Sequence, residues 1–184
     1  MRSQPLTRVR AQLPRSAAAL AVVAVLSTAA CASAHKAASA PCTGTFMGVS
    51  VANQTDGTTD PKTTSNCNQT PATLEVKDLI TGSGTAASPT STVTVQYEGV
   101  LYANGKAFDS SWSRGQAATF SLQQVVPGFT QGIGGTDGVA PMKIGGRRIM
   151  ILPADLGYGA SGSSDGSIPP NTPIVFVVDL VAVS

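Results

Sequence analysis

TVTVQYEGVLYANGKAFDSS, residues 92–111, is the stretch that decides the fold of this chain. Apolar and polar residues alternate in its first half. Val93, Val95 and Tyr97 therefore fall on one face of an extended strand, and polar side chains fall on the other. In its second half, Asn104-Gly105 is a strong signal for a two-residue hairpin turn. We therefore expect a half-buried strand that turns back on itself, which is the beginning of an antiparallel sheet.

Similar strand-like runs recur on both sides of this stretch, separated by Gly-, Ser-, Asn- and Pro-rich turns. They lie at residues 74–80, 119–122, 147–152 and 174–183. No helical stripe is long enough to alternate with these strands, which argues against a wound parallel sheet. A helix fits only between Gly128 and Gly146, where each internal glycine costs about 1 kcal/mol relative to alanine. The expected fold class is α+β, with one antiparallel sheet and one short helix.

The first 34 residues differ from the rest in having the three-part layout of a secretory signal. Four arginines precede an apolar run at 17–26, which is too short to span a bilayer, and small residues follow it at 27–34. We expect residues 1–34 to be a signal peptide and the protein to be exported, to a periplasm, a cell surface or the medium. Cleavage after Ala34 and cleavage before Cys31 both stay open. In the second case Cys31 would carry a lipid, and only then would the protein be held at a membrane.

Residues 35–73 are dominated by Thr, Ser, Asn, Ala and Gly, with one short β-like run at 45–52. Such a composition buries too little apolar surface to fold alone, so we expect a flexible arm. Cys42 and Cys67 are an even pair in an oxidising compartment, which favours a disulfide over two free thiols. A disulfide across this loop would stabilise the fold by roughly 3 kcal/mol on the chain-entropy model.

Charge and residue types exclude several classes of function. Beyond the leader, eight basic and ten acidic residues remain, and the adjacent pair Arg147–Arg148 is expected to be solvated at the end of a strand. No basic face for nucleic acid is indicated. The only histidine is His35, so the folded part has no base for a Ser-His-Asp or Cys-His relay and no cluster for zinc. We expect no metal and no cofactor.

GYGASG, residues 157–162, matches the G-x-G-x-x-G fingerprint of dinucleotide-binding proteins. That fingerprint works only where the glycines open a helix whose N-terminus meets the pyrophosphate. Here SSDGSIPPNTP follows, and its prolines and turn formers are incompatible with a helix. The match is therefore interpreted as accidental.

Four stretches, taken in order, resemble the successive signatures of the FKBP-type peptidyl-prolyl isomerases. They are VQYEGVLYANGKAFDSSWSRG (95–115), FSLQQVVPGFTQGI (120–133), MKIGGRRIMILPADLGYGASG (142–162) and IPPNTPIVFVVDLV (168–181). The resemblance implies an FKBP-like domain over 74–184, in which a strongly twisted antiparallel sheet wraps around one short helix with an apolar pocket between them. It also implies rotation about X-Pro bonds, proline-containing polypeptide clients and macrolide-type ligands.

The resemblance assigns a role to each matching residue. Asp109 would be the family's single buried acid, Tyr158 would offer its hydroxyl to a substrate carbonyl, and Phe129 would form the pocket floor where most members carry tryptophan. The expected substrate-binding residues are the walls Tyr97, Phe108 and Phe176, the lip Val125 and Val126 with its docking amide, and the flap residue Ile168. GYGASG would then be the loop that lifts Tyr158 to the rim.

The function expected is a prolyl isomerase for exported proteins. The apolar pocket would disfavour the planar, dipolar amide more than the twisted one. The alternative is a non-catalytic module with the same fold that grips apolar or proline-containing segments, suggested by Phe129 and by the glycine-rich segment that follows it.

Overall fold

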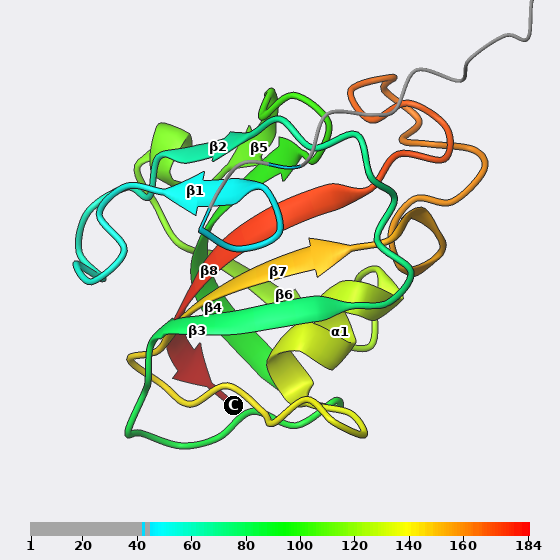
Figure 1. Cartoon of the computed structure of the whole chain (residues 1–184). Helices are drawn as coiled ribbons and strands as arrows, with labels where there is room; N and C mark the ends of the chain where they lie inside the picture. The colour runs from blue at the N-terminus through cyan, green and yellow to red at the C-terminus, as the bar shows by residue number, and fades with distance from the viewer. Residues whose placement is uncertain (1–41, 43–44) are drawn as a thin grey trace, which may run out of the picture. The chain divides into compact units, whose positions relative to one another are not determined.

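The computed structural model describes Cys42 and residues 45–184 (Figure 1). The predicted signal peptide at 1–34, and with it the alternative that Cys31 is lipidated, lie outside the described residues. Within them, a six-stranded sheet has the order β3-β7-β8-β4-β5, with β6 also paired to β4, and every pairing is antiparallel. Its strands are β3 (Glu75–Ile80), β4 (Thr92–Leu101), β5 (Ala107–Ser110), β6 (Ala118–Ser121), β7 (Arg147–Leu152) and β8 (Ile174–Val183). The α+β prediction is confirmed.

The single α-helix of the described residues, α1 (Pro127–Gly134), lies close to the sheet because its glycines leave room. A Cβ at Gly128 would lie 2.5 Å from Cγ of Leu152, and one at Gly132 would lie 2.3 Å from Sδ of Met150. The same glycines weaken the helix by themselves, so packing rather than propensity holds it. The prediction of one short, packed helix is confirmed.

The central strands β7 and β8 are buried on both faces of the sheet. Met150 and Phe176 face α1 and the larger core cluster, whereas their neighbours Ile151 and Val175 belong to a second cluster on the opposite face. Alternate side chains of a strand point to opposite faces, so both faces must be covered to bury such a run. The cover of the second face comes from the segment before β3.

That cover is a two-stranded sheet of β1 (Val49–Val51) and β2 (Thr63–Ser65), visible in front of β8 and β5 in Figure 1. Val49 is fully buried in the second cluster, and the hydroxyl of Tyr102 donates a 2.7 Å hydrogen bond to the carbonyl of Met47. The prediction of a flexible arm is therefore wrong for residues 45–73. The segment lacks a core of its own, but the apolar back of the sheet supplies one. The predicted disulfide between Cys42 and Cys67 is confirmed.

The two adjacent arginines at the start of β7 are buried. The expectation that Arg147 and Arg148 are solvated at the end of a strand is therefore wrong. Arg147 is 0% exposed and makes a two-pronged contact with Asp179, at 2.5 Å and 2.7 Å. It also donates to the carbonyls of Asn53 and Thr59, in the loop between β1 and β2. The guanidinium thereby fastens that loop to the sheet.

Arg148 points to the other face, where it pairs with Asp78 and donates to the carbonyls of Gly132 and Ala140, at 2.8 Å and 2.7 Å. Gly132 lies in the last turn of α1, whose carbonyls lack partners inside the helix. Arg148 therefore helps to hold the helix at a fixed place over the sheet. No helix of the described residues is long and apolar enough to cross a bilayer.

Candidate active site

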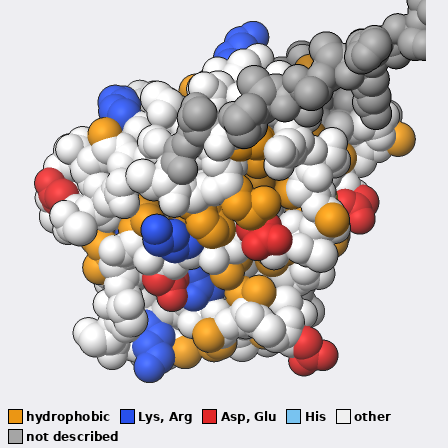
Figure 2. Space-filling model, in the orientation of Figure 1, with side chains coloured by type: hydrophobic (Ala, Val, Ile, Leu, Met, Phe, Trp, Pro, Cys, Tyr) orange, Lys and Arg blue, Asp and Glu red, His pale blue; other side chains and the backbone are white. Residues whose placement is uncertain are grey.

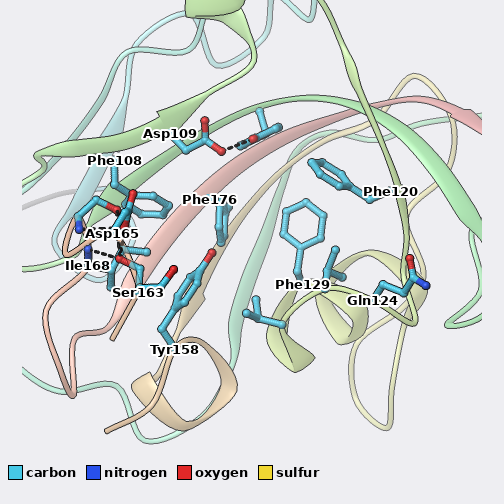
Figure 3. Close-up of a pocket in the computed structure, with 15 residues that line it drawn as sticks. Phe108, Asp109, Phe120, Gln124, Phe129, Tyr158, Ser163, Asp165, Ile168 and Phe176 are labelled. Carbon is cyan, nitrogen blue, oxygen red and sulfur yellow. Dashed lines mark hydrogen bonds between the residues drawn. The ribbon is translucent and has the colours of Figure 1, made fainter. Parts of the chain in front are cut away.

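A pocket of about 650 Å³ opens beside α1, between the sheet and the loop that joins β7 to β8 (Figure 3). It contains every residue that the sequence placed at the site: Tyr97, Phe108, Asp109, Val125, Val126, Phe129, Tyr158, Ile168 and Phe176. Its remaining lining residues were not predicted: Phe120, Gln124, Ser163, Ser164, Asp165 and Ser167. The structure thus brings residues from six separate segments to one cavity.

The base of the pocket is a cluster of aromatic rings that meet edge to face. Phe129 of α1 lies 5.1 Å from Phe176 of β8, and Tyr97 of β4 lies 6.2 Å from the same ring, measured between centroids. Phe108 of β5 contacts Phe176 at 5.6 Å. Such pairs are favourable beyond the area they bury, so the contacts between the rings stabilise this apolar base. Gly99 is required beside it, because a Cβ there would lie 2.6 Å from Cζ of Phe108.

Asp109 lies at the rim and is held by two neighbours. The hydroxyl of Tyr97 donates to one carboxylate oxygen, and the guanidinium of Arg114 forms an ion pair with the other. Arg114 also donates a 2.8 Å hydrogen bond to the Tyr97 oxygen and lies 5.6 Å from the centroid of that ring. The acid, the phenol and the guanidinium therefore form a closed triangle on one wall.

The expectation that Asp109 is the single buried acid is wrong. The side chain of Asp109 is 41% exposed, whereas that of Asp179 is only 10% exposed, and Glu98 is buried as well. Asp109 sits at the end of β5, where the pocket opens to solvent, and the buried carboxylates lie elsewhere in the sheet.

Arg114 is the functional neighbour that sequence reasoning missed. It follows Asp109 by five residues and reaches back across the short 3-10 helix η1 (Trp112–Arg114), which Gly115 ends in a left-handed conformation with φ of 70°. The sequence offered one clue to this contact: Arg114 in SWSRG is a single basic residue close to Asp109 along the chain.

The hydrogen bonds and the burial of Asp109 and Tyr97 determine their protonation states. Burial raises the pKa of Asp109, but the hydrogen bonds from Tyr97 and Arg114 outweigh it and leave the pKa below its usual value. Burial, with the hydrogen bond to Asp109, raises the pKa of Tyr97 to about 12. At neutral pH Asp109 is therefore ionised, and Tyr97 keeps the proton that it donates.

Tyr158 rises from the loop after the 3-10 helix η2 (Ala154–Leu156), and its ring leans into the pocket with the hydroxyl toward Phe176 (Figure 3). Gly159 and Gly162 follow it with φ of 62° and 70°, and a Cβ at Gly162 would meet the Ile168 carbonyl at 2.3 Å. GYGASG is thus a turn that positions a tyrosine, and no helix follows it. Burial, reinforced by the charges of Asp109 and Asp165, raises the pKa of Tyr158.

Val126 occupies the N-cap position of α1, with φ of −60° and ψ of 145°. Within the described part of the chain its N–H has no hydrogen-bond acceptor. An amide at this position lies before the first turn, where helical N–H groups lack partners in the helix. It is available to a carbonyl that enters the pocket.

Residues 83–181 match the family model of the FKBP-type peptidyl-prolyl cis-trans isomerases. The chain belongs to this family. It is 45% identical over 115 residues to an FK506-binding protein of Streptomyces anulatus, in an alignment that covers 61% of this chain and 88% of that protein. It is 38% identical over 117 residues to the chloroplastic isomerase FKBP13 of Arabidopsis thaliana, covering 60% of this chain and 56% of that one.

Solved FKBP structures resemble this isomerase in fold. The crystal structure of AtFKBP13 has a TM-score of 0.57 and 34% identity, and the match covers 66% of this chain and 98% of that one. FkpA of Escherichia coli has a TM-score of 0.54 and 34% identity, and the match covers 66% of this isomerase but only 51% of FkpA. The residues matched by the family model include the whole pocket, whereas β1 and β2 precede them.

Proposed function

We propose that this isomerase is exported and acts on X-Pro bonds of exported polypeptides, by desolvating the prolyl amide in the aromatic pocket. The observation that carries the proposal is the convergence of Phe129, Phe176 and Tyr97 at the base of one cavity, beneath the polar groups of Asp109, Tyr158 and the Val126 amide.

The chemistry needs no covalent step. Amide resonance places partial charges on oxygen and nitrogen and gives rotation a barrier of about 18–20 kcal/mol. The two X-Pro ground states differ by only about 0.5–1 kcal/mol, so the reaction is slow rather than uphill. A twisted amide has lost that resonance and is less dipolar. Phe129 and Phe176, which are 4% and 6% exposed, form the floor of the cavity. This apolar floor therefore destabilises the planar, dipolar amide more than the twisted amide.

The polar groups of the pocket would orient the substrate. The free N–H of Val126 and the hydroxyl of Tyr158 are two separate donors in the lining of the same pocket, so each can hold one of the two carbonyls nearest the proline nitrogen. Asp109, ionised and fixed by Tyr97 and Arg114, would face the carbonyl carbon as it rotates. We assign Tyr158 to the carbonyl of the residue before proline.

Export is supported by features outside and inside the described residues. The first 34 residues have the layout of a secretory signal, and Cys42 and Cys67 are joined in a disulfide, which persists in oxidising compartments. Fractionation of cells that carry the protein or its Cys31→Ser variant tests the lipid anchor. If the wild type is found in the membrane fraction and the variant is not, lipidation is supported. If both are distributed equally between the membrane and soluble fractions, lipidation is rejected.

The proposed activity is tested by NMR exchange spectroscopy on a short proline peptide, which reports both binding and interconversion. We expect the wild type to accelerate exchange, and Asp109→Asn and Tyr158→Phe to lower kcat/KM by about tenfold or more. Asp137→Asn, an exposed carboxylate outside the pocket, is the matched control. Peptide binding without any acceleration by the wild type would instead establish the non-catalytic binding module.

A further inference from the structure

Asp165 lies at one end of the pocket, in the turn at residues 163–168, which we call the flap. Its charge is not neutralised within the described part of the chain. It forms none of the ion pairs found there, whereas the other acid of the pocket, Asp109, is paired with Arg114. Figure 3 shows Asp165, Ser163, Ile168 and Phe108 toward one end of the pocket, and Phe120 and Gln124 toward the opposite end.

The flap fixes this carboxylate through one of its two oxygens. Oδ1 accepts hydrogen bonds from the Ser163 hydroxyl at 2.6 Å, the Ser167 hydroxyl at 2.8 Å and the Ser167 N–H at 3.1 Å. The turn is closed by the Ile168 N–H, which donates to Ser163 Oγ at 2.8 Å, and by the Ser163 N–H, which donates to the Ile168 carbonyl at 2.9 Å. Oδ2 has no partner among the described residues, so it can accept from a ligand.

The Asp165 carboxylate is ionised at neutral pH, and its charge acts on a group inside the pocket. The hydrogen bonds of Ser163 and Ser167 lower the pKa of Asp165 to about 2. Its charge also contributes to the raised pKa of Tyr158, after burial and after Asp109. The carboxylate therefore acts electrostatically on the hydroxyl that is assigned to the substrate.

We propose that Asp165 is a specificity residue that favours substrates with lysine or arginine immediately before the proline. The inference rests on the proposed function, because Tyr158 is assigned there to the carbonyl of that same residue. A side chain leaving that position on the flap side of the pocket enters the field of Asp165. A long basic side chain can lay its methylene stem along Phe108 or Ile168 and extend its charge toward Oδ2.

The expected preference is modest because Asp165 is exposed. Two unit charges about 7 Å apart in water favour the cationic substrate by about threefold. Salt shortens the reach of this attraction, from about 10 Å at 0.1 M to about 3 Å at 1 M ionic strength. A preference of electrostatic origin must therefore disappear at high salt, whereas a preference based on shape would persist.

The test compares two peptides that differ only in the terminal ammonium group, Ala-Lys-Pro-Phe and its norleucine analogue, by NMR exchange spectroscopy at low salt and at 1 M salt. At low salt we expect the Lys-to-norleucine ratio of kcat/KM to be about threefold higher in the wild type than in Asp165→Asn. The two ratios should converge at 1 M salt. Asparagine can still accept the three bonds at Oδ1, so the flap is preserved. Asp137→Asn, outside the pocket, should keep the wild-type ratio.

Equal ratios in the wild type and in Asp165→Asn, or a ratio that is independent of salt, would overturn the proposal. Should Asp165→Asn lose the flap structure, Ser164→Lys neutralises the same end of the pocket from an exposed neighbouring position and must lower the ratio instead. Absence of exchange with either peptide in the wild type would refute the isomerase function, not the selectivity. In that case the ratio of the peptide dissociation constants, from the same spectra, decides whether Asp165 selects.

Discussion

Replacing Arg114 with methionine should move the acid limit of activity upward in pH. Arg114 lowers the pKa of Asp109, together with Tyr97 and against the effect of burial. The two partner side chains are 44% and 41% exposed, so solvent screens their attraction, and a pair of this kind is worth about 0.2–1 kcal/mol. Loss of Arg114 should therefore raise the pKa of Asp109, because one of the contacts that favour its ionised form is removed.

The direction follows from which state binds protons. The folded-state pKa of Asp109 is depressed, so its ionised form contributes stability above the unfolded-state pKa of about 3.9, and that contribution is lost as pH falls through the folded-state value. In Arg114→Met this loss begins at a higher pH. Activity that needs ionised Asp109 should therefore begin to decline at a higher pH in Arg114→Met than in the wild type.

The assay is a carbon-13 titration of the Asp109 carboxyl between pH 2 and pH 6, run beside peptide exchange on the same samples. Arg114→Lys is the matched variant, because lysine keeps the charge but cannot contact Asp109 and Tyr97 through two separate nitrogens, and its titration should fall between the other two. An Asp109 midpoint that stays in place or moves downward in Arg114→Met would refute the role given to the guanidinium. A midpoint that moves while the activity profile does not would refute the need for an ionised Asp109.

Three further results are expected. Phe129→Ala should lower the free energy of unfolding by about 3 kcal/mol and remove most activity, measured by urea denaturation and peptide exchange, because it empties the centre of the aromatic base. Reduction of Cys42–Cys67 should lower the free energy of unfolding by roughly 3 kcal/mol while kcat/KM at 25 °C stays within about twofold; a large drop in kcat/KM would contradict a purely stabilising bond. Arg147→Met should lower the free energy of unfolding by about 3–5 kcal/mol, because it leaves the buried Asp179 carboxylate without its ion-pair partner. The double variant with Asp179→Leu should recover much of that loss, measured by urea denaturation in a double-mutant cycle.

The pocket side of the molecule could be predicted because its determinants are local or occur in fixed motifs. The alternation at 92–100 placed Tyr97 on the inner face of β4, and the prolines at 169–170 excluded a helix after GYGASG. The remaining pocket residues came from the resemblance to a family, and periodicity by itself could not have gathered them.

Strand register explains what could not be predicted. Arg147 lies directly opposite Asp179 where β7 pairs with β8, and Arg148 lies opposite Asp78 where β7 pairs with β3. Two adjacent arginines look like a solvated pair until the sheet order places a carboxylate across from each of them. The link between Arg114 and Asp109 also escaped prediction, because a contact five residues apart across a 3-10 turn leaves no periodic pattern.

The packing of residues 45–73 against the sheet follows from the composition of β8 rather than from the composition of that segment itself. IVFVVDLV has apolar side chains at both parities, so a sheet covered on one face only would leave Val175 and Val177 in water. Burying such side chains is worth about 1.5–3 kcal/mol each, which is enough to order a Thr- and Ser-rich segment that could not fold alone. Phe176 lies between these two valines on the opposite face, so the arm stabilises the strand that positions a pocket wall. Residues 45–73 therefore pack against the sheet that carries the pocket and are not a spacer in front of it.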